Sequence, residues 1–309
     1  MTSAASEADR RRSISSARRR AVAGFGRVTP RVRFAVAAAH PARRPRAQRT
    51  SSALALIALD LATGKLRWHY QLVSPDICGY DAASLPVLLD LPGPNKQPVP
   101  MLAAASKSGR IYVLNRIIGE PLRRSRAFVR QDAPMLRQPT RDGINVAPGA
   151  AGGANWPPAA SRQPPAAYSP STGWIYVPAT HYQLKQDADG HPVTELSFPD
   201  DVERSGTLSA IDPANGTIKW QLKTSLPLVS GALATAGGLV FTGESNGDLI
   251  AVAAKDGKRV WRFATGARVN APPISYRVGS RQFIAVAAGG HPLFKFSLGD
   301  AVIAFALPQ

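Results

Sequence analysis

Apolar and polar positions alternate along much of the chain in short segments that end in turn residues. After Asn215-Gly216, the side chains at 218, 220 and 222 are apolar and those at 217, 219 and 221 are polar. Side chains of a strand point alternately to its two faces, so this segment predicts a β-strand with one solvated face. The preceding residues and the Asn-Gly pair predict a partner strand and a tight turn, which together make a hairpin.

The same pattern occurs two more times. One copy is the segment 251–261, with Asp256-Gly257 at its turn, and the other is the segment 58–68, with Gly64 at its turn. Trp220 and Trp261 are 41 residues apart, which is the length of one propeller blade. The segment 249–254 is apolar at every position, so this strand is expected to be covered on both faces, as in sheets stacked face to face.

Composition supports an all-β protein. The 309 residues are 44% hydrophobic and include 26 Gly and 27 Pro, which suits many short strands joined by turns. No apolar run is long enough to span a bilayer as a helix. The single cysteine, Cys78, excludes an intrachain disulfide and a cysteine-rich metal site.

The net charge of +18 is concentrated at the start of the chain. Residues 1–50 contain 13 Arg against Glu7 and Asp9, which is +11, and residues 51–309 carry only +7. This Arg-rich tail lacks a periodic apolar face, and we expect it to be disordered. A nucleic-acid-binding arm, an organellar targeting peptide and a non-native translated segment all remain open, although few aromatic residues accompany the arginines and no nucleic-acid partner is expected.

Further strands are predicted at 85–91, 99–105, 110–114, 174–177, 282–288 and 301–306. The segment 121–148 is long, basic and without a regular pattern, and 182–205 is a polar excursion. We predict no strand in either.

These residues and motifs resemble the C-terminal part of the pyrroloquinoline quinone (PQQ)-dependent, or quinoprotein, alcohol dehydrogenases. The matching segments are 58–71, 109–122, 152–157, 168–179 and 206–290. The family fold is an eight-bladed β-propeller with tryptophan docking repeats. The resemblance therefore implies that residues 51–309 form a partial β-propeller, about half of the family fold, and that the family's N-terminal half has no counterpart here.

The resemblance also implies which residues contact the cofactor. Lys107 stands where the family has a Lys or Arg that contacts the quinone, and Asn155 and Trp156 match the family's Gly-Gly-x-Asn-Trp motif. An ammonium group can stabilise charge on a quinone oxygen, an amide can donate hydrogen bonds to it, and an indole can stack on the ring. From the residues alone, a solvated hairpin lysine, a turn asparagine and a core tryptophan are the alternatives.

The sequence departs from the family where catalysis is expected. In the segment 74–81, Cys78 replaces a family Trp and Gly79 replaces the Asp that acts as catalytic base beside calcium. Glycine cannot accept a proton, so no catalytic residue is assigned, and Asp76 and Asp81 would both need a new orientation to substitute. The resemblance implies PQQ and calcium as cofactors, yet no cluster of oxygen ligands for calcium is evident and no metal ligand is assigned.

Two functions follow as expectations. The first is a PQQ- and calcium-dependent oxidoreductase acting on an alcohol or sugar, in a truncated and catalytically impaired form. The second is a non-catalytic propeller fragment that binds or scaffolds. Exposed faces of terminal blades are expected to favour self-association or a second chain. The family implies a periplasmic location, although the chain shows no credible signal peptide.

Overall fold

The computed structural model describes residues 32–37, 55–73, 80, 84–93, 95–131, 144–149, 152–155, 166–182, 184–186, 204–290 and 297–307. All regular elements in these ranges are strands. They are β1 (Val32–Ala37), β2 (Ala55–Asp60), β3 (Leu66–Gln71), β4 (Val87–Pro92), β5 (Pro98–Ala105), β6 (Ile111–Asn115), β7 (Pro121–Arg124), β8 (Ile144–Val146), β9 (Ala167–Ser169), β10 (Trp174–His181), β11 (Leu184–Gln186), β12 (Ser205–Ile211), β13 (Ile218–Thr224), β14 (Ala232–Ala234), β15 (Leu239–Gly243), β16 (Asp248–Ala253), β17 (Arg259–Ala264), β18 (Ile274–Val278), β19 (Arg281–Ala288) and β20 (Ala301–Ala306). Nothing in the described ranges is a helix that could cross a membrane.

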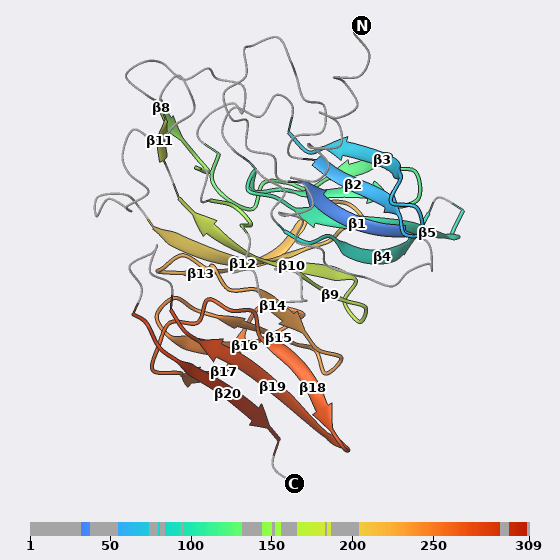
Figure 1. The fold of residues 1–309 in the computed structure, drawn as a ribbon. Helices are drawn as coiled ribbons and strands as arrows, with labels where there is room; N and C mark the ends of the chain where they lie inside the picture. Colours follow the sequence, from blue (N-terminus) through green and yellow to red (C-terminus); the bar gives the residue numbers. More distant parts are fainter. Residues whose placement is uncertain are drawn as a thin grey trace, which may run out of the picture.

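The strands form five antiparallel sheets that follow one another along the chain, and we call these sheets blades. The first blade is β1-β2-β3, the second β4-β5-β6-β7, the third β9-β10-β12-β13, the fourth β14-β15-β16-β17 and the fifth β18-β19-β20. A small sheet pairs β8 with β11. Figure 1 shows this succession from the blue N-terminal strands at upper right to the red C-terminal strands at the bottom. The expected all-β partial propeller is confirmed, because the blades do not close into a ring in the described part of the chain.

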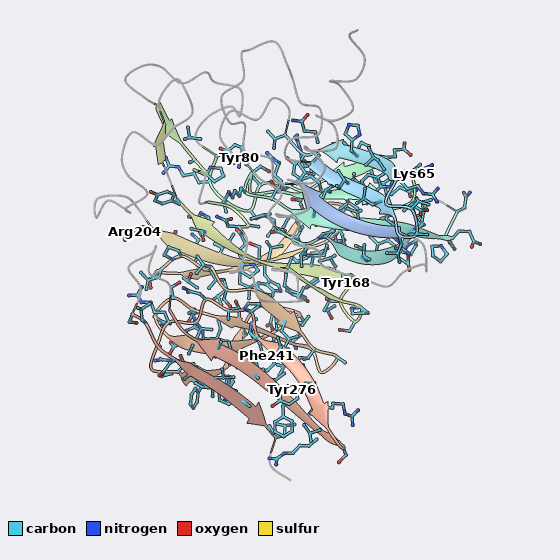
Figure 2. The ribbon with its side chains drawn as sticks, viewed as in Figure 1. Lys65, Tyr80, Tyr168, Arg204, Phe241 and Tyr276 are labelled. Carbon is cyan, nitrogen blue, oxygen red and sulfur yellow. The ribbon has the colours of Figure 1, made fainter. Side chains whose placement is uncertain are left out.

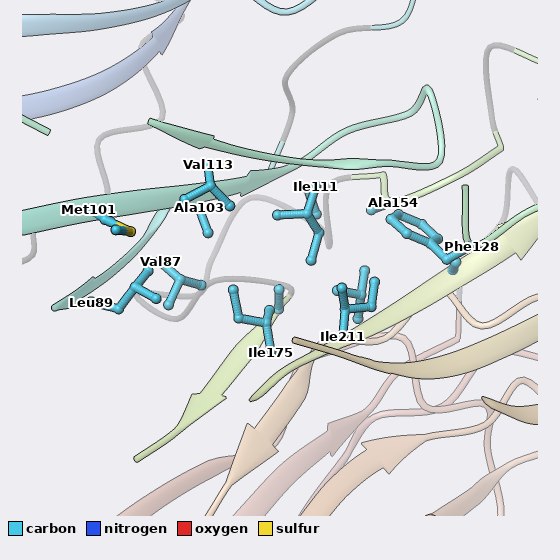
Figure 3. Packing of buried hydrophobic residues seen from close by; sticks show 14 of the residues in the cluster. Val87, Leu89, Met101, Ala103, Ile111, Val113, Phe128, Ala154, Ile175 and Ile211 are labelled. Carbon is cyan, nitrogen blue, oxygen red and sulfur yellow. The ribbon is translucent and has the colours of Figure 1, made fainter. Parts of the chain in front are cut away.

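Four hydrophobic clusters lie between successive blades. The largest joins β4, β5 and β6 of the second blade to β10 and β12 of the third, with residues such as Met101, Ile111 and Ile175 in contact (Figure 3). Equivalent clusters lie between the first and second blades, the third and fourth, and the fourth and fifth. Strand β16 is buried along almost its whole length, as its uninterrupted apolar sequence predicted, because it contributes to two of these clusters.

A recurring turn shapes the outer hairpin of the first four blades. The N–H of Gly64, Gly119, Gly216 and Gly257 each donates to the carbonyl four residues earlier, at 2.7–2.9 Å. All four glycines have φ between 68° and 76°, a conformation that costs an L-residue energy. We call the end of the blades that carries these turns the docking end.

Two tryptophans lie on the docking-end turns of the following blade. Trp68 of the first blade covers Gly119 of the second, and its indole N–H donates to the carbonyl of Arg116 at 3.2 Å. Trp220 of the third blade covers Gly257 of the fourth, and its N–H donates to the carbonyl of Ala254 at 3.0 Å. Trp261 of the fourth blade is 37% exposed and packs edge-on against Phe305 of the fifth.

Most predicted strands are present within a few residues of their expected bounds. The alternation in 217–222 is confirmed, since Ile218, Trp220 and Leu222 are half-buried and Lys219 and Gln221 exposed. Strands β7 and β8 were missed in the segment 121–148, as was β11 in the polar excursion. Strand β7 has Arg123 at the position that Trp220 occupies in β13, counted from the turn glycine, so the aromatic signal was lacking there.

Strand β1 lies inside the segment 1–50, for which we expected disorder. It pairs antiparallel with β2 in full register, from Val32 opposite Asp60 to Ala37 opposite Ala55. The inner edge of β2 offers unpaired backbone groups, and pairing satisfies them. The division of the chain at residue 50 otherwise stays a prediction.

The contact between Trp220 and Gly257 predicts a large effect of a single methyl group. In Gly257→Ala the new Cβ would lie about 2.5 Å from the Trp220 ring, in addition to the strain of positive φ. In the control Gly64→Ala, φ is +68° but no atom lies within 4 Å of the Cβ position. We expect about 1 kcal/mol of destabilisation in the control and about 1–3 kcal/mol more in Gly257→Ala, measured by urea denaturation. Equal losses would mean that the indole does not pack on this turn.

Candidate functional site

The Lys107 turn connects β5 to β6 at the end of the second blade opposite the docking end. The N–H of Ser106 donates to the carbonyl of Arg110 at 3.1 Å, and the N–H of Gly109 donates to the carbonyl of Ser106 at 2.9 Å. Gly109 takes a φ of +69° in closing the turn. Lys107 is only 7% exposed, so it is not the fully solvated hairpin lysine of the alternative interpretation.

The segment 152–155 lies directly against the Lys107 turn. The N–H of Ala154 donates to the carbonyl of Ser106 at 3.2 Å, and Gly153 exchanges two backbone hydrogen bonds with Thr180 at the end of β10. A Cβ on Gly153 would overlap the backbone carbonyl of Lys107. Only glycine permits this approach, which links the second and third blades through main-chain contacts.

These contacts bring two of the three candidate cofactor residues to one place. Asn155 directly follows the Ala154 amide that is bonded to the Lys107 turn, and its side chain is half-buried. Both residues offer N–H donors, which suit an electron-rich oxygen such as that of a quinone. Trp156 lies outside the described residues.

The loop that follows β3 reaches the same end of the molecule. Tyr80 is 2% exposed, and its hydroxyl donates to the carbonyl of Pro148 at 2.6 Å. Figure 2 shows Tyr80 and Lys65 at opposite ends of the N-terminal blades. Asp76, Cys78, Gly79 and Asp81, on which the sequence argument about the catalytic base depends, lie outside the described residues.

The turn between β15 and β16 of the fourth blade has the same two backbone hydrogen bonds as the Lys107 turn. It carries an acidic side chain instead of a basic one. The N–H of Glu244 donates to the carbonyl of Asp248 at 2.7 Å, and that of Gly247 to the carbonyl of Glu244 at 3.1 Å. Burial raises the pKa of Glu244, while Arg259, whose Nη2 lies 2.7 Å from Glu244 Oε1, opposes this shift. The buried acid here is paired within its own blade, whereas the turn at Lys107 carries a basic side chain.

Sequence reasoning missed Gly153 and Tyr80 as residues that shape this site. Gly153 belongs to the Gly-Gly pair before Asn155, so a signal was present, but the need for glycine becomes clear only from the approach of Lys107. Tyr80 was visible as an aromatic residue in a polar loop, and nothing in the sequence indicated that Pro148 accepts its hydrogen bond. Among the described residues, no group of three His, Cys, Asp or Glu side chains is arranged to hold a metal ion.

Comparison with known protein families agrees with this architecture. Residues 40–127 match the family described as glucose/ethanol/alcohol dehydrogenase, beta-propeller domain, a PQQ family. Residues 204–300 match a second PQQ family, described as outer membrane protein assembly factor BamB. The chain is 31% identical to a quinoprotein ethanol dehydrogenase of Pseudomonas aeruginosa, over 75% of this chain and 41% of the relative.

Solved structures give the same relationship. The crystal structure of the quinohemoprotein alcohol dehydrogenase from Comamonas testosteroni superposes with a TM-score of 0.69 at 26% identity, covering 82% of this chain and 42% of that one. PQQ family domains and quinoprotein alcohol dehydrogenase relatives thus cover about 75–80% of the chain, which is similar to a part of these dehydrogenases. A europium-containing methanol dehydrogenase has a TM-score of 0.61 at 25% identity, covering 77% of this chain and 46% of that one. The chain spans about two fifths of the length of the curated relatives it matches.

The main-chain contact at Gly153 can be tested by amide hydrogen exchange. Gly153→Ala is expected to displace the segment 152–155 from the Lys107 turn, because the methyl group would overlap the carbonyl of Lys107. Exchange of the Ala154 amide should then become at least about tenfold faster. Gly173→Ala is the control, since its φ is +71° and its Cβ position is open. Unchanged protection of Ala154 in Gly153→Ala would contradict the contact.

Proposed function

We propose that this chain provides a quinone-binding wall of a PQQ-dependent alcohol dehydrogenase, with Lys107, Asn155 and Trp156 as contacts to the cofactor. The observation that supports the proposal is the backbone approach of Gly153 to Lys107, which brings the Lys107 turn and the segment 152–155 together at one end of two adjoining blades. The family relationship supports PQQ as the group that these donors face.

The residues at this end fit a quinone on chemical grounds. When bound, PQQ supplies an acceptor for the electrons removed from the hydroxyl-bearing carbon of the substrate. Lys107 would stabilise the negative charge that develops on the cofactor's oxygens, in a position where little water competes because the side chain is almost fully buried. Asn155 would orient the cofactor through its amide, and Trp156 would stack on it. Calcium remains an implication of the family, since no metal cluster exists among the described residues, and we assign it no ligand.

We further propose that the chain is catalytically impaired. Gly79 stands where the family has the aspartate that removes the proton of the substrate hydroxyl. A carboxylate at that point accepts the proton as the electrons leave, and typical contributions of such a base are about 10²–10⁴-fold in rate. The substrate class is therefore an alcohol or sugar for binding, with little or no turnover. Following the family, we propose that it works in the periplasm.

A non-catalytic binding or scaffold role is the second candidate, and the exposed face of the last blades favours it. Four apolar side chains on or near the fifth blade have exposed fractions of 64–83%: Val278, Leu298, Val302 and Leu307. Trp261 and Phe263 of the fourth blade are also partly exposed, and both pack against Phe305 of the fifth. An apolar surface of this kind is typical of a contact with another chain or a second copy.

Binding of PQQ is the decisive experiment for the quinone-wall proposal. Titration of PQQ into the purified chain, with excess Ca²⁺, is expected to quench tryptophan fluorescence in a saturable manner. Lys107→Ala should weaken binding at least about tenfold, because it removes the buried cation. The control Lys65→Ala removes an equal charge at the docking end and should leave binding unchanged. Absence of saturable quenching in a chain with a β-rich far-UV spectrum would reject the proposal and leave the scaffold role.

An activity assay distinguishes a catalytically impaired chain from one in which another residue acts as the base. The unmodified chain is expected to show no PQQ-dependent oxidation of ethanol or glucose above the background of free PQQ, followed with a dye acceptor. Gly79→Asp should not restore it if the remaining blades of the family fold are also required. Clear turnover by the unmodified chain would contradict the impairment, and it would direct attention to Asp76 and Asp81 as bases.

A further inference from the structure

Strand β20 is the last strand of the fifth blade in the described part of the chain, and one of its edges has no partner strand there. The corresponding third strands of the second, third and fourth blades, β6, β12 and β16, are paired on both edges. Those strands are buried along almost their whole length, whereas every residue of β20 is exposed or half-buried. Figure 1 shows β20 at the lower margin of the ribbon, beside β19. An apolar strand that is interior in the other blades therefore forms an open edge in the fifth.

The edge strands that follow the docking-end turns of the first four blades all carry exposed basic side chains. These are Arg67 in β3, Arg124 in β7, Lys219 in β13 and Arg262 in β17. Charged side chains on an edge strand oppose pairing with another chain, because a second strand would have to desolvate them. The sequence of β20 is Ala-Val-Ile-Ala-Phe-Ala, which contains no charge and no proline. This edge thus lacks the protection that the other four have.

The fourth blade presents an incompletely covered aromatic surface beside β20. The rings of Trp261 and Phe263 on β17 are stacked with their centroids 6.2 Å apart, and Phe305 of β20 packs edge-on against them at 5.1 and 4.9 Å. Phe305 covers only part of this surface, since Trp261 is still 37% and Phe263 40% exposed. Because β17 is the strand beyond β16 in its own blade, a strand beyond β20 in the next blade would lie over these rings.

The side chains of β20 determine which strand fits the open edge. No residue of β20 can form an ion pair, so a charged partner strand would gain nothing there, and an apolar strand is favoured. The outer strands β7, β13 and β17 all run antiparallel to the third strand of their blade. A second copy of β20 meets both conditions. A two-fold axis makes the strands antiparallel, and each copy then satisfies the open edge of the other.

We propose that two copies of this chain associate by antiparallel pairing of β20 with β20, which joins their fifth blades into one continuous sheet. With Ile303 opposite its own copy, Val302 lies opposite Ala304, and the same register places Ala301 opposite Phe305. Each of these unlike pairs combines a large side chain with a small one and keeps both on one face of the sheet.

The same pairing covers the aromatic surface of the fourth blade. The paired β20 of the second copy takes the position beyond β20, so its Ile303 and Phe305 lie over Trp261 and Phe263 of the first copy, and the reverse holds as well. The inference gives the scaffold role one specific partner. It is tested separately from quinone binding, because a dimer can form or fail to form whatever the PQQ titration shows.

The mass and the amide exchange of the full chain test the pairing. Sedimentation equilibrium over a concentration series is expected to show a reversible dimer of the 32.8 kDa chain and no larger species, because a two-fold contact uses both open edges. At concentrations where the dimer predominates, the β20 amides that point away from β19 should exchange at least about tenfold more slowly than in the dilute monomer.

Val302→Lys places a charge on the open edge. It should weaken the dimer at least about tenfold, because the two lysines would lie diagonally on the same face near the two-fold axis. The matched control is Val278→Lys, the same change at a 64% exposed residue of β18, which is the opposite edge strand of the same blade. The control should dimerise as the unmodified chain does. Both valines are largely exposed, so both variants are expected to keep the β-rich far-UV spectrum of the folded chain.

Four results would overturn the proposal: a folded chain that stays monomeric throughout the series, oligomers that grow beyond two chains, equal weakening by the two lysine variants, or a dimer in which the β20 amides are not protected. A monomer whose outward β20 amides are already protected would show that another segment of the same chain covers the edge. Protection of a monomer only after an extended apolar peptide is added would assign the edge to a foreign strand, and either result would exclude the second copy.

Discussion

The structure depends on the burial of each blade by its neighbour. A single antiparallel sheet of three or four strands has two faces, and most faces here are apolar, so none of the blades is a stable unit without the next. Clusters of side chains fill the space between successive blades. The tryptophans at 68 and 220 fix the spacing at the rim, because each indole lies on a turn glycine of the following blade and donates to a carbonyl beside it. Stacking and docking together set the angle between blades.

The same constraint positions the candidate site. Because β6 runs from the Lys107 turn to the docked turn at 115–119, packing at one end of the blade determines where the other end lies. The segment 152–155 then spans the second and third blades through backbone hydrogen bonds, and the glycine at 153 permits the close approach to Lys107. A site formed at the ends of stacked strands is rigid without a helix to support it, which suits a flat cofactor that must be held in one orientation.

The second and fifth blades each depart from the regular pattern of four strands with a docking tryptophan. Strand β7 carries Arg123 where a docking tryptophan would stand, and the neighbouring Arg124 borders a cavity between the first two blades. At the far end, the fifth blade has three strands in the described part of the chain, and apolar side chains around it are largely exposed.

The sequence by itself determined the all-β class, the repeated hairpins with their turns, and the family resemblance. Alternating apolar positions and Asn-Gly or Asp-Gly pairs are local signals, and they identified the hairpins around 218–222 and 249–263 and the residues Lys107 and Asn155 as candidates. Strands β1, β9, β14, β15 and β18 were not predicted, nor were β7, β8 and β11, which have only three or four residues each, too few for an alternating pattern to show. Only the tertiary structure decided that Gly153 packs on Lys107 and that the hydroxyl of Tyr80 donates to the carbonyl of Pro148. These contacts join residues from different blades or strands, and their geometry follows from how the blades stack, which no local pattern in the chain specifies.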